Sequence, residues 1–259
     1  MKLSSLLLKA AVICGLTTTA IATVPSAIAQ VGMSPLFIES EASRGRAQGV
    51  LTLINSSDES MRVRLYAEPF TFNQDGFVSL PADEKDLSPY LQFSPREVVI
   101  PARSDQRVRL LGTFPPGLAD GEYKAVVFAE ELEPSSTDSN GVAIKARVGT
   151  TVYMRQGQLS AELTNINAIP SEQSIDLIVE NMGLATARPQ VKWTLHRDGE
   201  EIAEGEEVAH TVVAKSSRKV PLPLSEALPT GSYTLSGKLI WTTLEEDYSQ
   251  PFELPVVVP

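Results

Sequence analysis

One run of the sequence alternates between apolar and polar residues from Gly141 to Arg155. Successive side chains of a β-strand point to opposite faces, so the run predicts one long, half-buried strand, about twice the mean strand length of about 5–6 residues. A strand of that length overruns a small domain, and its surplus edge is available to pair with another chain. The apolar side consists of Val142, Ile144, Ala146, Val148, Thr150, Val152 and Met154.

The rest of the chain also reads as short strands between turns, and no window keeps a helical period for more than two turns. The connections Asn73–Gly76 and Arg197–Glu200 carry Asp-Gly, a strong hairpin signal. Two sets of short strands at regular spacing are typical of two immunoglobulin-like β-sandwiches. We therefore expect an all-β chain with domains at 30–156 and 157–259.

The first 29 residues predict export. Lys2 and Lys9 precede or flank a short apolar run, and an Ala-x-Ala sequence ends at Ala29, as in a cleaved secretory signal peptide. Its removal would take Cys14, the single cysteine, so we expect no disulfide. The net charge of −10 argues against nucleic acid and anionic membranes as partners, and we expect no membrane insertion.

Residues that would carry catalysis or bind a metal are scarce. The chain has only two histidines, His196 and His210, and a zinc site without cysteine would need both of them plus carboxylates. It has no nucleophile elbow, metalloprotease motif or phosphate loop. The acidic run Glu200–Glu207 lacks the spacing of a calcium loop, and we expect it to form solvated turns. We expect a protein that is not an enzyme, with no catalytic residue, cofactor or metal.

The run Phe93–Leu110 is more specific than a generic strand-turn-strand unit. A proline precedes a short strand, a turn follows, and the next strand carries Val-Arg-Leu. It resembles the central stretch of the periplasmic pilus-assembly chaperones, the PapD-like family. Gly49–Ser57, with its Asn55, is similar to the second strand of that family, and Glu122–Glu131 is similar to its sixth. The resemblance covers roughly residues 33–155 and rests on the order and spacing of these strands.

The resemblance implies a mechanism for the long strand. Such chaperones lend a strand to a pilus subunit that lacks the last strand of its own fold, and insert alternate apolar side chains into the open groove. Burying one Val or Ile side chain fully is worth about 1.5–3 kcal/mol. The alternative, an ordinary core strand, stays open. The implied client-binding positions are Val142, Ile144, Ala146 and Val148, with Thr150–Met154 built into the chain's own sheet.

The sequence departs from this family at the site that binds the client's terminal carboxylate. The resemblance implies a basic residue in the first strand and another in the seventh, between the domains. Here those positions fall at Glu39 or Ser40 and at Thr151, none of which is basic. Basic residues nearby that could substitute are Lys145, Arg147, Arg44 and Arg46.

We therefore expect a periplasmic chaperone that binds a pilus-like or other surface-fibre subunit, with an outer-membrane usher as the further partner that the resemblance allows. The second half of the chain matches the family poorly and reads as a generic immunoglobulin-like module. The alternative function is a structural or adhesive β-sandwich module of the cell envelope that chaperones nothing.

Overall fold

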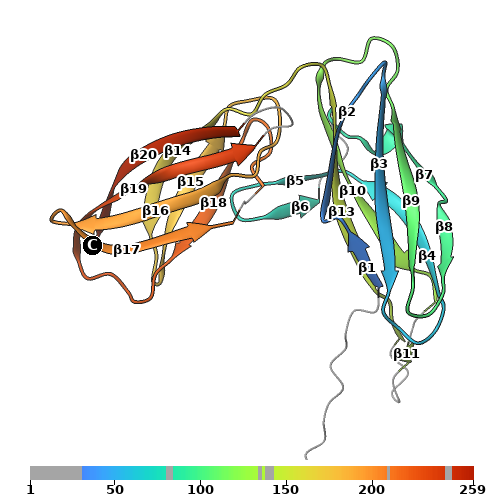
Figure 1. The fold of residues 1–259 in the computed structure, drawn as a ribbon, viewed down its shortest axis with the longest axis horizontal. Coiled ribbons are helices and arrows are strands. Elements are labelled where there is room, and N and C mark those ends of the chain that lie inside the picture. The colour runs from blue at the N-terminus through green and yellow to red at the C-terminus, as the bar shows by residue number, and fades with distance from the viewer. Residues whose placement is uncertain (1–30, 80–83, 134–135, 138–142, 209–210, 243–246) are drawn as a thin grey trace, which may run out of the picture.

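The structure, a computed structural model, describes residues 31–79, 84–133, 136–137, 143–208, 211–242 and 247–259. The expected signal peptide lies outside these residues. Figure 1 shows two elongated β-sandwiches joined end to end at an angle, with the chain crossing between them once. All the regular structure described is β-strand, apart from one turn of 3₁₀ helix, η1 (Ser88–Tyr90), so the expected all-β fold is confirmed.

The first sandwich consists of two packed sheets. Strands of the first sheet are β1 (Val31–Ser34), β3 (Arg46–Asn55), β9 (Asp105–Thr113) and β7 (Leu91–Ser94), in that order. Strands of the second sheet are β2 (Phe37–Glu41), β13 (Arg147–Gln156), β10 (Gly121–Glu131), β4 (Met61–Glu68) and β8 (Glu97–Ile100), in that order.

Alternation along these strands builds the core between the two sheets. In β4, Met61, Val63 and Leu65 are buried while the arginines between them are exposed, as the sequence pattern predicts. On β13, Val152 and Met154 are fully buried in the same core. Burial of this apolar surface, worth about 25 cal/mol per Å², is the main stabilising contribution in a chain with no disulfide.

The second sandwich has its own core. One sheet contains β14 (Leu163–Pro170), β15 (Ser174–Asn181) and β18 (Ser216–Pro223); the other contains β17 (Glu200–Glu207), β16 (Gln190–Arg197), β19 (Gly231–Thr242) and β20 (Asp247–Val258), each in that order. The Asp198-Gly199 pair joins β16 to β17 with both residues at positive φ, 52° and 83°. This is the predicted hairpin, since an Asp-Gly pair at positive φ matches the twist of the strands it joins.

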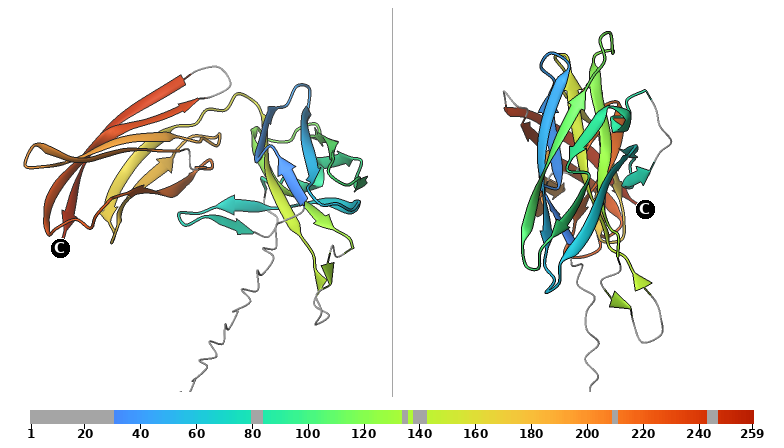
Figure 2. Two further views of the ribbon diagram at one scale, coloured as in Figure 1. Left: turned by 60° about the horizontal axis from the view of Figure 1, so that its bottom comes forward. Right: turned by 90° about the vertical axis from the view of Figure 1, so that its right-hand side faces the viewer.

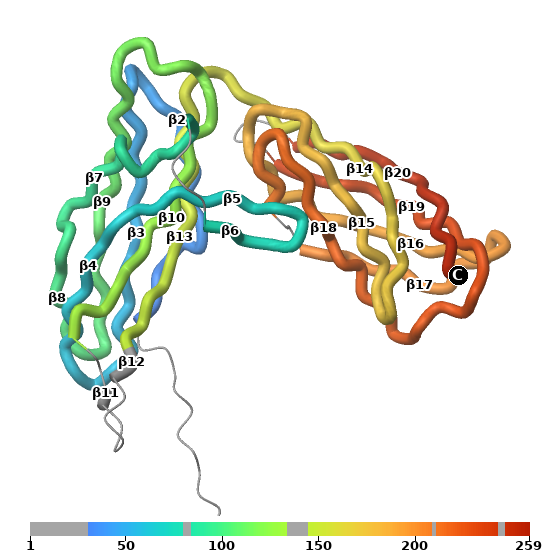
Figure 3. The backbone as a smooth tube through the Cα atoms, turned by 180° about the vertical axis from the view of Figure 1, so that it is seen from behind, coloured from blue at the N-terminus to red at the C-terminus, as the bar shows by residue number. Residues whose placement is uncertain are grey.

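Two smaller pairs of strands project from the first sandwich. The hairpin β5 (Phe70–Phe72) and β6 (Phe77–Ser79) follows β4 and extends toward the second sandwich (Figures 1 and 3). The pair β11 (Ser136–Thr137) and β12 (Ala143–Ile144) lies at the opposite end of β13, away from the linker between the sandwiches (Figure 2).

Two expectations need correction. The alternating run is not one strand: β12 ends at Ile144, β13 begins at Arg147, and the two residues between belong to neither. The acidic run is the strand β17 rather than a set of turns, because an edge strand can place its carboxylates in water while it pairs with β16 on one side. The hairpin signal at Asn73–Gly76 is confirmed, since this turn joins β5 to β6, although the two strands themselves were not among those expected. Within the described residues, no helix has the length and apolar character to cross a membrane.

Candidate functional site

Strand β13 has one fully paired edge and one partly open edge. Its whole length pairs with β10, from Arg147 to Gln156. On the other side, β2 runs parallel to it and pairs only with Thr151–Arg155. In the part of the chain that the structure describes, no strand pairs with the first residues of β13 on the β2 side.

The backbone groups at the open edge can be assigned from the hydrogen bonds around them. Thr151 donates its backbone N–H to the Leu36 carbonyl on the β2 side, at 3.3 Å. Alternate residues of a strand direct their backbone groups to the same side, so the N–H and C=O groups of Arg147 and Gly149 also face that side. These groups form a short, unpaired β-edge that is available to an incoming strand.

An exposed apolar residue lies beside this edge. Leu36, which comes directly before β2, is 80% exposed although it contacts β13 through its carbonyl. The adjacent Phe37 is 43% exposed. An apolar side chain this exposed next to unpaired backbone groups is typical of a surface that a partner covers.

The proposed client-binding residues have different positions in the structure. Ala146 and Val148 are half-buried and pack against the core of the first sandwich. Ile144 belongs to β12, where its backbone pairs with Ser136. Val142 lies outside the described residues. In the described part, the apolar row therefore continues the core face of β13, and only the backbone of the edge is free.

The four candidate substitute anchors lie away from the space between the sandwiches. Arg147 lies over the Phe128 ring, 3.6 Å from its centroid, and pairs with Glu68 at 3.5 Å. Lys145 is exposed near the start of β13. Arg44 is exposed in the turn from β2 to β3, and Arg46 is exposed at the start of β3. None of the four lines the cleft described next.

A cleft of about 730 Å³ lies between the two sandwiches. Its first wall comes from β2 and the end of β13, and its second wall comes from the segment before β16 and from the ends of β19 and β20. Thr151, the position where the resemblance implies a base, does not line it, whereas Glu39 does. Polar and aromatic residues that line it include Glu39, Arg155, Thr186, Arg188, Trp241 and Tyr248.

A buried ion-pair network crosses this cleft. Arg155 donates from Nε to Glu122 at 2.9 Å, and their side chains are only 7% and 3% exposed. Glu122 in turn accepts hydrogen bonds from the backbone N–H and the hydroxyl of Thr186, which belongs to the second sandwich. Arg155 also donates to the Thr186 carbonyl at 3.1 Å. A carboxylate that is bound by this many donors is held in one position.

A second cation reaches the cleft from the second sandwich. Arg188 forms an ion pair with Glu39, which also pairs with Arg155 at 3.3 Å. The Arg188 guanidinium lies over the ring of Phe37, 3.7 Å from its centroid. Its Nε and Nη2 atoms are buried and have no hydrogen-bond partner among the described residues. Burial raises the pKa of Tyr153, whose ring centroid lies 5.0 Å from this guanidinium.

Aromatic residues of the second sandwich complete the cleft. The rings of Trp241 and Tyr248 are stacked, 5.5 Å apart. The indole Nε1 of Trp241 is buried with no hydrogen-bond partner among the described residues. The cleft thus combines apolar rings with N–H donors that lack acceptors, a surface that fits a group with hydrogen-bond acceptors.

Arg155 and Arg188, which line the cleft, and Glu122, the buried partner of Arg155, were not predicted from the sequence. Arg155 ends the alternating run, and a charge at the end of an otherwise half-buried strand was a usable signal. Arg188 had no such signal, because its contact with Glu39 joins residues 149 positions apart.

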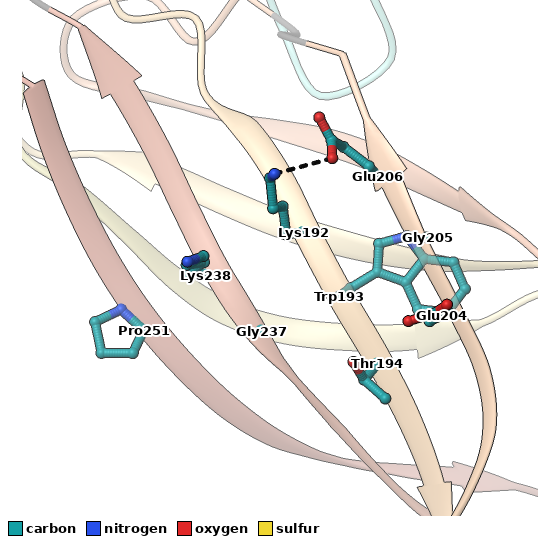
Figure 4. A pocket seen from close by; sticks show the side chains of 9 residues that line it. All are labelled: Lys192, Trp193, Thr194, Glu204, Gly205, Glu206, Gly237, Lys238 and Pro251. Carbon is teal, nitrogen blue, oxygen red and sulfur yellow. Dashed lines mark ion pairs between the residues drawn. The ribbon is translucent and has the colours of Figure 1, made fainter.

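The outer face of the second sandwich also has a shallow groove, of about 570 Å³, that crosses β16, β17 and β19 (Figure 4). Lys192 and Glu206 form an ion pair across it at 3.1 Å. Trp193 pairs with Gly205 on one side and Gly237 on the other, and its indole lies where a Gly205 side chain would be. Packing of this buried indole explains Gly205, and the close approach of the Lys192 carbonyl and the Phe252 ring explains Gly237, so neither glycine requires a ligand in the groove.

Metal chemistry has no support in the described residues, where no group of three or more histidine, cysteine or acidic side chains comes together. His196 is half-buried near the end of β16, beside a surface hollow that it shares with Asp198 and Tyr233.

Comparison with solved structures identifies the fold. The chain is similar to a class 5 fimbriae chaperone, CfaA, with a TM-score of 0.50, 14% sequence identity, and coverage of 88% of this chain and 99% of that one. It is also similar to the YadV chaperone, with a TM-score of 0.52, 12% identity, and coverage of 87% and 100%. The chain has the fimbrial-chaperone fold.

A scan of family models finds no match to the sequence, and a search of the curated proteins finds none either. The fimbrial-chaperone fold is therefore identified by structure, and at this level of identity the similarity reaches the fold alone. The expected resemblance to pilus-assembly chaperones is confirmed at that level, over both sandwiches rather than the first half only.

Proposed function

We propose that this protein is a periplasmic chaperone that binds incomplete, immunoglobulin-like fibre subunits by strand addition to β13. The proposed chain consists of a signal peptide at 1–29 and domains at 30–156 and 157–259. The observation that carries the proposal is the open edge of β13, where the backbone of Arg147 and Gly149 faces away from β10 beside the exposed Leu36. The fimbrial-chaperone fold supports it.

The open edge gives the proposed mechanism its two components. Backbone hydrogen bonds to Arg147 and Gly149 would supply affinity, and apolar side chains at Val142, Ile144, Ala146 and Val148 would set the register of the client strand. Ala146 and Val148 already cover the end of the first core, so a client strand laid beside them would extend that core rather than expose new surface.

Client binding in this proposal does not depend on the family's basic pair. Glu39, one of the two candidates for the first-strand position, already forms ion pairs with Arg188 and Arg155. The substitutes Lys145, Arg147, Arg44 and Arg46 lie outside the cleft. Arg188 is the cleft residue best placed for a carboxylate, because its Nε and Nη2 atoms have no acceptor among the described residues.

The test separates the backbone of the edge from its side chains. Arg147→Pro removes the N–H that faces the open side and leaves the ladder to β10 intact, whereas Arg147→Ala keeps the backbone and removes the guanidinium. Each variant is co-expressed with a candidate fibre subunit, and the complex is purified through a tag on the chaperone. We expect Arg147→Pro to lower the amount of complex by about fivefold or more, since one hydrogen bond contributes about 1 kcal/mol. Arg147→Ala should match the unmodified protein.

Ile144→Asp tests the apolar register independently, because a carboxylate there would have to enter the client's apolar groove. Circular dichroism establishes that each variant is folded. If both Arg147→Pro and Ile144→Asp retain full complex formation, strand donation is wrong. The structural or adhesive module would then be favoured by retention of the protein with the envelope fraction rather than release with the soluble periplasm.

A further inference from the structure

The β5–β6 hairpin reaches across from the first sandwich to the second. In Figures 1 and 3 it leaves the end of β4 and its tip lies beside β18. The tip is a shaped turn rather than a loose loop. The side-chain oxygen of Asn73 accepts hydrogen bonds from the backbone N–H groups of Asp75 and Gly76, and Gly76 has a φ of 150°. Such a turn holds its backbone in one conformation before any contact is made.

The tip forms hydrogen bonds to the N-terminal part of β18. The backbone N–H of Lys219 donates to the Gln74 carbonyl at 3.1 Å, and Gln74 donates from its side chain to the Ser217 hydroxyl at 2.9 Å. Lys219 also pairs with Asp75 at 3.1 Å. These contacts include a backbone bond at a sheet edge, which surface ion pairs alone would not provide.

Arg218 adds a contact with a desolvation cost. It donates to the Asn73 carbonyl at 2.9 Å, and its guanidinium lies 5.4 Å from the centroid of the Phe72 ring. Burial between the two sandwiches lowers the pKa of Arg218 from its usual value. A cation is placed in such surroundings only where the contacts around it compensate.

The base of the hairpin is an aromatic cluster that spans both sandwiches. Phe70 is 2% exposed, stacks on Phe77 at 5.5 Å and meets Tyr153 of β13 edge-on at 5.8 Å. Val213, from the second sandwich, packs into this cluster with Val126. Neither sandwich buries this cluster alone, so its burial depends on their relative position.

The hairpin and the cleft are separate connections. The cleft network joins Glu122 to Thr186, and the hairpin joins its tip to β18 through different residues and a different strand. One point of contact plus the linker leaves a hinge free to turn, whereas two separated contacts fix an orientation. Domains joined by a small polar interface move relative to each other by default, so the second contact is what would remove that motion.

We propose that the β5–β6 hairpin is an interdomain clasp, which holds the two sandwiches in a single relative orientation by docking on the edge of β18. The rest of that edge carries Pro221 and Pro223, which lack N–H groups and resist pairing with other chains. The hairpin thus covers the part of β18 where such protection is absent. The proposal does not depend on the chaperone function.

Distance measurement between the sandwiches tests the clasp. Spin labels are placed on cysteines at the exposed positions Gln48 and Gln250, in a chain whose single cysteine, Cys14, is replaced by Ser. We expect one narrow distance distribution in the otherwise unmodified protein. Arg218→Ala, which removes the partly buried guanidinium, should broaden the distribution roughly twofold. Arg107→Ala, an exposed arginine on β9, is the matched control and should leave it unchanged.

Two further measurements keep the proposal falsifiable if Arg218→Ala unfolds. Asn73→Ala removes the turn at the tip without changing the second sandwich, and should broaden the same distribution. In the unmodified protein, the Lys219 amide should exchange with solvent as slowly as the interior amides of β18. A Lys219 amide that exchanges like an exposed loop amide, or a distribution that stays narrow in both folded variants, would overturn the clasp.

Discussion

Removal of the Glu122 carboxylate tests how strongly the buried network connects the sandwiches. Glu122→Ala leaves three donors without their acceptor: the Arg155 Nε, the Thr186 N–H and the Thr186 hydroxyl. Breaking a buried ion pair by removing one partner costs about 3–5 kcal/mol. Arg155 retains Glu39 at 3.3 Å, so we expect the lower end, a loss of about 3 kcal/mol in the free energy of unfolding.

The assay is urea unfolding followed by two signals. Circular dichroism reports on both sandwiches, whereas tryptophan fluorescence reports on the second, because Trp193 and Trp241 are the two tryptophans of the chain. If the network couples the sandwiches, the two transitions coincide in the unmodified protein and separate in Glu122→Ala. Coincidence in both proteins would show that the network does not couple them.

Glu130→Ala is the matched control on the same strand. Glu130 pairs with Arg64 at 3.3 Å, with the two side chains 30% and 49% exposed, and such surface pairs contribute about 0–1 kcal/mol. The reasoning is refuted if Glu122→Ala costs no more than Glu130→Ala. A double variant in which Glu122 and Arg155 both become Met should recover part of the loss, because it leaves no buried charge unpaired.

Three further changes have directions that follow from the structure. Burial raises the pKa of Tyr153 above its usual 10.0. The neutral phenol therefore contributes stability that is fully present below pH 10 and is lost as the pH rises through the folded-state pKa. In urea unfolding from about pH 9 to about pH 11, the free energy of unfolding should fall less steeply with pH in Tyr153→Phe than in the unmodified protein. Gly237→Ala would place a Cβ 2.2 Å from the Lys192 carbonyl oxygen, and thermal unfolding should show a loss of stability of about 1–3 kcal/mol. The control is Gly32→Ala, whose Cβ would have its nearest neighbour at 3.5 Å, and it should cost less than about 1 kcal/mol. Asn55→Ala should lower the free energy of unfolding by about 3 kcal/mol, since its buried amide donates to three backbone carbonyls; an unchanged urea midpoint would contradict this role.

The local patterns of the sequence predicted the strands well and their limits less well. Alternation of buried residues with arginine in β4, and the Asp-Gly turn between β16 and β17, depend only on neighbouring residues, and both are confirmed. The break at Lys145–Ala146 was not predicted, because the alternation continues through it. Periodicity shows which face a residue takes, but not whether a backbone partner exists on either side.

The connections between the sandwiches could not be predicted at all. Glu39 and Arg188, and likewise Gln74 and Ser217, meet only once two separate domains have folded and docked. A short-range pattern contains no information about such pairs. The β5–β6 hairpin illustrates the limit, since its turn signal at Asn73–Gly76 was visible while its docking partner was not.

Glu39 connects these observations to the proposed function. It stands where the resemblance implies a base, and it accepts Arg188 from the second sandwich together with Arg155 from the first. A carboxylate of this chain therefore already pairs with both cleft arginines, and a client's terminal carboxylate would have to compete with it or bind the Nε and Nη2 atoms of Arg188, which have no partner among the described residues. Under the proposed function, the affinity for a client must then come from the open edge of β13, where Arg147 and Gly149 direct their backbone groups outward. The cleft, tied by its own ion pairs, would act mainly to hold that edge and the second sandwich in register.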